Sequence, residues 1–379
     1  EHTSRGLGDV YKRQSLYNWW KDIDKFLFFL IILLISLSIF FSLVSTSLIA
    51  STKLETTSYY FFFKQFIYTL LGIFTIFLFS LLEEKTFYKL SLASFIIILC
   101  TLILVPIFGV EVKGSKRWID IFFFPRFQPI EILKPFLIII LSMILTSEKY
   151  SNKYARYLLS LIAIIPIILL LFLQPDIGQT LLVLSLWLSL IFVSGINLIF
   201  LILFILIGLC TLFLMINFIP KLSYIKFRID SFFDLTSKGN YQSERASEAI
   251  MNGGFFGKGI GEGTLNVRVP EAHTDYVIAV IAEEFGIISI IGIILIFLCL
   301  IFRVFKKVST IEDECFKLIL VGSVMLILFQ VLVHIGVNIR FLPTTGMTLP
   351  FLSYGGSSII GSSILIGIIL NLTKRKINK

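Results

Sequence analysis

The chain is dominated by runs of about 20 apolar residues, a length that spans the hydrocarbon core of a bilayer as a helix. Of its 379 residues, 57% are apolar and 15% are charged. Soluble domains have roughly 45–50% apolar and about 25% charged residues. One globule of this size cannot bury such an excess, which excludes a soluble enzyme. The 39 phenylalanines stand in runs with Ile and Leu, unlike the alternating pattern of an outer-membrane barrel.

Short polar segments divide the apolar sequence into ten predicted membrane helices. They cover residues 25–50, 59–82, 90–108, 129–146, 157–173, 178–195, 198–219, 275–302, 316–337 and 356–372. We therefore predict an all-α integral membrane protein, a polytopic bundle of about ten transmembrane helices with one large extracytoplasmic loop at 220–274. Residues 15–379 are expected to form a single membrane domain. Residues 1–14 are polar and unlike the rest of the chain, and we interpret them as a non-native leader.

The basic residues predict the orientation of the chain. Ten spans place both termini on one side, and Lys and Arg concentrate there and in the alternate loops. They include Lys21, Lys25, Lys149, Lys153, Arg156, Arg303, Lys306, Lys307 and Lys374. That side is predicted to be cytoplasmic, so the segments 109–127, 174–178, 220–274 and 338–352 face outward. The net charge of +9 results from these basic loops and does not indicate nucleic-acid binding.

The first outward segment and the helix after it carry four candidate site residues. Lys116 and Arg117 are outward cations, which fit either headgroup anchoring or an anionic substrate such as a phosphate. Glu131 and Lys134 lie three residues apart on one face of a membrane helix. Charges at that depth are costly unless paired or hydrated, which predicts an ion pair, either purely structural or on a cavity wall.

Two further outward segments carry polar residues beside Pro and Gly. Asp176, between Pro175 and Gly178, is most simply a helix cap. Residues 241–263 predict a short amphipathic helix that runs into a glycine-rich loop. This loop is either a flexible turn or a cradle for an anion at its N–H groups and Lys258.

Acids and bases crowd the outer end of the eighth span. They are Arg268, Glu271, His273, Asp275, Glu283 and Glu284, with the hydroxyl of Thr274 among them. A cap could explain Asp275 alone, but several carboxylates beside Arg268 at a membrane boundary favour a functional site. Near the last span, residues 338–358 combine prolines, glycines and hydroxyls, among them Ser353 and Gly355. Such irregular backbone at membrane depth must be buried or line a wet cavity.

These motifs resemble the SEDS family (shape, elongation, division and sporulation) over residues 20–372. The matching blocks are GSKRWI at 114–119, QPIEILKP at 128–135, QPDIGQ at 174–179, PEAHTDY at 270–276 and LPFLSYGGSS at 349–358. The blocks GKGIGEG at 257–263, AEEFG at 282–286 and LPTTGMTLP at 342–350 resemble the division members more than the elongation members. Ile130, Tyr276 and Thr345 depart from the usual Ser, Phe and Lys of the family.

The resemblance implies a peptidoglycan glycosyltransferase that polymerises lipid II at the outer face of the bacterial cytoplasmic (inner) membrane, at the division septum. Asp275 matches the essential acid of the family and would be the general base. The implied substrate-binding residues are Lys116, Arg117, Glu131, Lys134, Lys258, Arg268, Glu271, His273, Thr274, Ser353 and Gly355. A divalent cation, Mg or Mn, could assist, although no ligand cluster predicts a metal site. The implied partners are membrane lipids, a class B penicillin-binding transpeptidase of the FtsI type and other divisome proteins.

Two other functions fit the resemblance less well. A lipid II flippase would use Glu131 and Lys134 in an internal cavity and would not need Asp275. A noncatalytic scaffold would only recruit a transpeptidase. The acids and bases on the outer side favour the enzyme.

Overall fold

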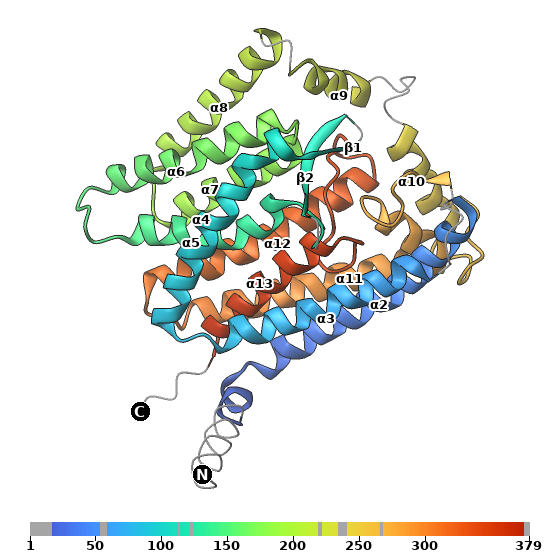
Figure 1. The fold of residues 1–379 in the computed structure, drawn as a ribbon, viewed down its shortest axis with the longest axis horizontal. Coiled ribbons are helices and arrows are strands. Elements are labelled where there is room, and N and C mark those ends of the chain that lie inside the picture. The colour runs from blue at the N-terminus through green and yellow to red at the C-terminus, as the bar shows by residue number, and fades with distance from the viewer. Residues whose placement is uncertain are drawn as a thin grey trace.

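In the computed structural model the chain is a bundle of long helices with a small sheet at one end (Figure 1). The structure describes residues 17–53, 59–112, 114–121, 124–218, 222–233, 241–265 and 268–374. The predicted leader, residues 1–14, and parts of the 220–274 segment lie outside the described residues.

Ten apolar helices in the described part of the chain form the bundle, and their bounds lie within a few residues of the predicted spans, apart from the start of α4 and the end of α11, which extend by about six residues. They are α2 (Lys25–Lys53), α3 (Tyr60–Leu81), α4 (Glu84–Phe108), α5 (Pro129–Thr146), α6 (Lys153–Leu173), α7 (Ile177–Val193), α8 (Leu198–Phe218), α11 (Val277–Val308), α12 (Glu314–Asn338) and α13 (Gly356–Leu372). Eight of them are long and apolar enough to cross a membrane, and α7 and α13 are shorter apolar helices. The prediction of a polytopic helical membrane protein is confirmed.

Helices α5, α12 and α13 form the buried centre of the bundle. Small residues let α13 approach its neighbours closely, as is common between membrane helices. A Cβ on Gly361 would lie 2.3 Å from the carbonyl oxygen of Glu131, and one on Gly367 would lie 2.7 Å from the Cβ of Phe79. The backbone of α13 therefore lies directly against α5 and α3, and this packing fixes the start of α5 where Glu131 stands.

The described residues of the segment 109–127 form a small antiparallel sheet rather than an irregular loop. Its strands are β1 (Val110–Val112), β2 (Ser115–Ile121) and β3 (Phe124–Phe127), in the order β1-β2-β3. Trp118 and Ile119 on β2 pair with Val110 and Phe127 on its neighbours. The charged residues hid the strand signal, because they interrupt the simple alternation of apolar and polar residues.

The described ends of the chain lie together, at the end of the bundle away from the sheet, α9 and α10 (Figure 1). There Asp24 accepts hydrogen bonds from Arg303 at 2.7 and 2.9 Å and lies 3.6 Å from Lys307 Nζ. The basic end of α11 is thus tied to the start of α2. An even number of crossings explains why both ends of the chain share this side.

Two helices and a loop complete the end of the bundle that carries the sheet. Helix α9 spans Ser223–Phe233 and α10 spans Tyr241–Gly253. The glycine loop, residues 253–265, returns to α11 at Gly286, where the helix is kinked by a φ of 77°. A Cβ at that position would lie 2.2 Å from the carbonyl oxygen of Phe255, so only glycine fits.

Candidate functional site

A cavity of about 840 Å³ lies at the end of the bundle that carries the small sheet. Its walls come from β2, the start of α5, α9, the turn before α11 and the loop between α12 and α13. Six of the residues predicted for the site line it: Arg117, Glu131, Glu271, Thr274, Asp275 and Gly355. Segments far apart in the sequence therefore meet around one space.

Asp275 stands in a tight turn immediately before α11. The carbonyl oxygen of Glu271 accepts hydrogen bonds from the backbone N–H groups of Thr274 and Asp275, both at 3.1 Å, and Glu271 itself has a φ of 55°. Left-handed backbone is unusual for a residue with a side chain and is typical of functional turns. The N-cap of α11 is Tyr276, whose side chain makes no capping hydrogen bond. Asp275 therefore does not occupy the N-cap position.

The loop between α12 and α13 is hydrogen-bonded to this turn. Ser353 Oγ donates to the carbonyl oxygen of Thr274 at 2.6 Å, and the Tyr354 N–H donates to that of His273 at 2.9 Å. The amide of Asn338, at the end of α12, donates to the carbonyl oxygen of Asp275 at 3.1 Å. Ser353 is fully buried, so it holds the turn in position rather than facing the cavity.

His273 lies outside the cavity lining, in an aromatic cluster. Its ring centroid is 5.6 Å from those of Phe61 and Tyr354. The geometry gives His273 a packing role beside Asp275.

At Gly346 the loop between α12 and α13 passes close to the opposite charges of Asp275 and Arg117. A Cβ there would lie 3.5 Å from Asp275 Oδ2 and 4.0 Å from Arg117 Nη1, and its φ is 69°. Asp275 and Arg117 therefore border the same small region of the cavity. Burial and the negative charge of Asp275 raise the pKa of the neighbouring Tyr276 phenol above its ordinary value.

The turn between α6 and α7 holds the guanidinium group of Arg117 in position. Its Nε lies 3.6 Å from Asp176 Oδ2 and donates to the carbonyl oxygen of Gln174 at 3.3 Å, while Nη2 donates to that of Pro175. Asp176 also accepts from the Gln179 N–H, so the predicted cap is confirmed. Burial raises the pKa of the Asp176 carboxyl, and the Arg117 guanidinium opposes that shift. Asp176 thus both starts α7 and orients Arg117.

Arg228 is a cavity residue that the sequence did not indicate. It lies on α9 and donates to the carbonyl oxygen of Thr344 at 3.1 Å. Burial and then the nearby positive charge of Arg117 lower the pKa of Arg228. Two cations that approach each other in a partly buried site are typical of a site for an anion. The amphipathic pattern of α9 was the only available signal.

Other predicted cations do not reach the cavity. Lys116, Lys258 and Arg268 are exposed and are absent from its lining. Lys116 alternates with Arg117 along β2, so the two side chains point to opposite faces. Lys64 and Arg126 line the cavity instead, and Arg126 pairs with Asp120 at 2.9 Å.

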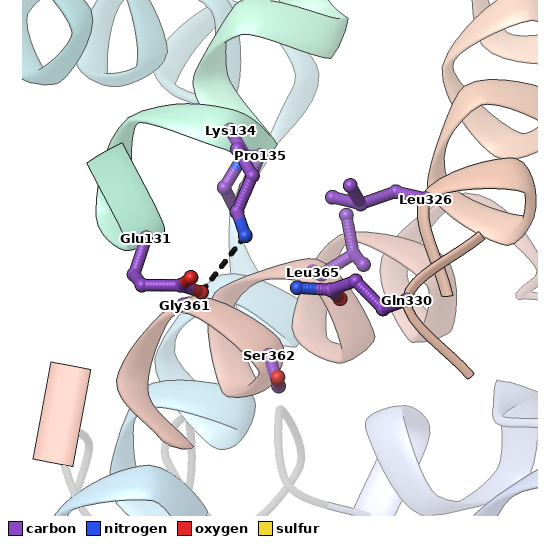
Figure 2. A pocket seen from close by; sticks show the side chains of 8 residues that line it. All are labelled: Glu131, Lys134, Pro135, Leu326, Gln330, Gly361, Ser362 and Leu365. Carbon is purple, nitrogen blue, oxygen red and sulfur yellow. Dashed lines mark ion pairs between the residues drawn. The ribbon is translucent and has the colours of Figure 1, made fainter. Parts of the chain in front are cut away.

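Glu131 and Lys134 form the predicted ion pair inside the bundle (Figure 2). Lys134 Nζ lies 2.9 Å from Glu131 Oε2, and both residues are almost fully buried. Lys134 donates to Gln179 Oε1 at 3.1 Å, and the Gln179 amide donates to Glu131. Glu131 also lines the cavity, whereas Lys134 borders a void of only about 10 Å³, room for about one water molecule.

Within the described part of the chain, no three His, Cys, Asp or Glu side chains gather in a group that could hold a metal ion. The charged groups that line the cavity are carboxylates, guanidinium groups and the ammonium group of Lys64. These residues are sufficient to orient an anion and to accept a proton from a hydroxyl.

Comparison of the sequence with protein families gives a match over residues 24–378 to the model of the FtsW, RodA and SpoVE cell cycle proteins. A probable peptidoglycan glycosyltransferase FtsW from Nitrosomonas europaea is 33% identical over 361 residues, which cover 93% of this chain and 92% of the relative. The FtsW of Wigglesworthia glossinidia brevipalpis, described in the same words, is 34% identical over 92% of each chain.

Two solved structures share the fold. One, described as showing the structural coordination of polymerization and crosslinking by a peptidoglycan synthase complex, matches with a TM-score of 0.72 and 27% identity over 93% of this chain and 97% of that one. The crystal structure of the rod shape determining protein RodA from Thermus thermophilus matches with a TM-score of 0.66 and 26% identity, over 93% and 96% of the two chains.

Proposed function

The chain belongs to the FtsW, RodA and SpoVE family of cell cycle proteins, and from that membership we propose that it is a peptidoglycan glycosyltransferase of the division type. Its substrate would be lipid II, the disaccharide-pentapeptide carried on a polyprenyl pyrophosphate. One observation in the structure supports this most directly: a single outer cavity holds a carboxylate, Asp275, together with the guanidinium groups of Arg117 and Arg228.

Asp275 would act as the general base. The acceptor hydroxyl of one lipid-linked sugar gives its proton to the carboxylate as its oxygen bonds to the anomeric carbon of the donor sugar. The bond between that carbon and the pyrophosphate oxygen breaks, and the pyrophosphate leaves with the electron pair. Positioned general bases contribute roughly 10²–10⁴-fold to such rates.

The leaving pyrophosphate needs positive charge that is in place before the bond breaks. Arg117 and Arg228 are assigned this role because both line the cavity and both are held by backbone carbonyls. Lys64 and Arg126 extend the positive wall. Lys258 and Arg268, considered from sequence, are not assigned it, because their exposed side chains lie outside the lining.

The direct test is the polymerisation of fluorescent lipid II by the purified protein, alone and with its cognate class B transpeptidase. The Asp275→Asn variant is the control. Glycan strands that form only with an intact Asp275 would support the enzyme. Transfer of lipid II across a bilayer without polymerisation would indicate a flippase, and loss of both activities with intact transpeptidase binding would indicate a scaffold.

We expect Arg228→Ala to lower the polymerisation rate roughly 10- to 100-fold, since hydrogen bonds to charged groups contribute about 1.5–3 kcal/mol. The loss should appear in kcat more than in KM, because charge on the pyrophosphate develops as the bond breaks. Lys226→Ala is the matched control: the same helix loses an exposed cation that does not line the cavity. Equal losses in the two variants would contradict a local role for Arg228.

The protein is a multi-pass membrane protein, and its finer placement is part of the proposal. We place both termini in the cytoplasm and the protein at the septum, in complex with an FtsI-type transpeptidase. The basic residues at the end of the bundle that holds both described chain ends support the orientation. A structural relative solved within a peptidoglycan synthase complex supports the partnership with another synthase protein.

A cysteine placed at Ser237, which is outside the described residues, should react with a membrane-impermeant maleimide added to intact cells. A cysteine at Glu312, in the exposed turn between α11 and α12, should react only after lysis. Both variants would be made after replacing the four native cysteines with alanine. The reverse labelling pattern would invert the topology and remove the outer cavity from the side where lipid II is polymerised.

A further inference from the structure

The glycine loop, residues 253–265, exposes an unusual amount of apolar surface. The side chains of Phe255, Phe256 and Ile260 are 73%, 83% and 64% exposed, and that of Met251, in the last turn of α10 just before the loop, is 70% exposed. Two adjacent phenylalanines with such high exposure are unusual in a loop that is surrounded by water.

The level of this loop relative to the bilayer can be placed from α11. Its first basic residue at the cytoplasmic end is Arg303, and a helix needs about 20 residues to cross the hydrocarbon core. Counting back from Arg303, that length ends near Glu283. The burial pattern agrees, because α11 is buried from Val277 to Glu284 and presents exposed Ile287, Ile288 and Ile291 after the Gly286 kink.

The glycine loop is fixed at this same level by backbone hydrogen bonds. The N–H groups of Lys258 and Gly259 donate to the carbonyl oxygens of Glu283 and Glu284 at 2.9 and 3.1 Å. In return, the carbonyl oxygen of Gly254 accepts from the Ile287 N–H at 3.0 Å. The exposed phenylalanines therefore adjoin the lipid-facing isoleucines of α11.

Several further backbone donors of the loop have acceptors in α11, and irregular backbone near hydrocarbon requires such partners. The carboxylate of Glu283 accepts from the Thr264 and Leu265 N–H groups at 3.0 and 2.8 Å, and Glu284 Oε2 accepts from the Gly261 N–H at 3.3 Å. Both glutamates are almost completely buried. Two buried acids thus serve as acceptors for loop amides, which explains residues that the sequence marked as a functional cluster.

We propose that the glycine loop is a membrane anchor whose Phe255 and Phe256 insert into the outer leaflet beside α11. Aromatic rings are favoured at this depth, and the exposed Lys258 can extend to the lipid phosphates. The anchor fixes the height of α11 in the bilayer. Because α11 is helical from Val277, Asp275 stands roughly 10 Å outside the anchored level. The loop thereby sets the distance between the outer cavity and the membrane surface.

The test is a nitroxide label on a cysteine at Phe256 in the full-length protein, reconstituted in phosphatidylethanolamine–phosphatidylglycerol vesicles. The four native cysteines are replaced by alanine. Power saturation compares collisions with oxygen and with a water-soluble nickel chelate. Leu295, on the exposed face of α11, gives the lipid reference, and Glu312 gives the aqueous one.

We expect the oxygen-to-nickel ratio at position 256 to match that at Leu295 and to exceed that at Glu312. A ratio like that at Glu312 would place the loop in water and overturn the proposal. Low collision rates with both reagents would show that protein covers the phenylalanines, a second copy for instance, and would overturn it equally.

If the cysteine-free protein does not fold, a second variant tests the same proposal. Phe256→Trp keeps the native cysteines and adds one fluorophore to the four native tryptophans. The added emission should be quenched by brominated lipids and not by iodide. Quenching by iodide and not by brominated lipids would reject the anchor.

Discussion

The Asp275→Asn variant should insert normally in the membrane, bind the proposed transpeptidase partner normally and lose nearly all polymerisation of lipid II. The amide keeps the size of the side chain, and the backbone bonds that hold the turn, from the Asp275 N–H to Glu271 and from Asn338 to the Asp275 carbonyl, do not involve the carboxylate. An amide cannot take the proton of the acceptor hydroxyl, so the expected loss is roughly 10²–10⁴-fold. The measurement is the initial rate of glycan formation by purified protein at matched concentration.

The control is Asp230→Asn, which removes an exposed carboxylate on α9 outside the cavity and should leave the rate close to that of the wild type. Glu271→Gln should have a milder effect than Asp275→Asn, because Glu271 lines the same cavity in a supporting role. Near wild-type polymerisation by Asp275→Asn would reject Asp275 as the base. The role would then pass to Glu271 rather than to Glu283, whose buried carboxylate is occupied by loop amides.

The membrane helices were predictable because a single physical quantity, apolar length, determines them. The predicted fourth and tenth spans coincide with α5 and α13. The sheet at 110–127 and the kink at Gly286 depend instead on contacts between segments distant in sequence. A sequence shows that Gly286 is glycine, but the close approach of Phe255 that requires glycine there exists only in the folded chain.

The sequence predicted the carboxylates that line the candidate site better than it predicted the cations that line it. Glu271 and Arg117 stood in segments predicted to face outward, Asp275 stood at the start of the span that follows one of them, and the structure brings all three to one cavity. Lys258 and Arg268 stood in the same segments but lie outside that cavity, because a tight turn or loop can point neighbouring side chains in opposite directions. Arg228 was not predicted, because residues 223–233 carry none of the motifs on which the site prediction rested.

The second large effect is expected from the buried pair of Glu131 and Lys134. Lys134→Met leaves a carboxylate almost fully buried without its cation, and breaking such a pair destabilises by about 3–5 kcal/mol. Gln179 can still donate to Glu131, but one neutral donor does not replace an ammonium group. We expect poorer expression and a lower melting temperature in detergent, measured by fluorescence-detected size-exclusion chromatography after heating.

The double variant Glu131→Gln with Lys134→Met removes both charges and should recover part of the lost stability. The surface pair of Lys317 and Glu314 is the matched control, since it has the same spacing on a helix and a distance of 2.8 Å but is solvent-exposed. Lys317→Met should therefore change stability by only about 0–1 kcal/mol. If Lys134→Met proves as stable as Lys317→Met and yet abolishes polymerisation, the pair acts through the cavity that Glu131 lines, and its role is in substrate binding rather than in holding the bundle together.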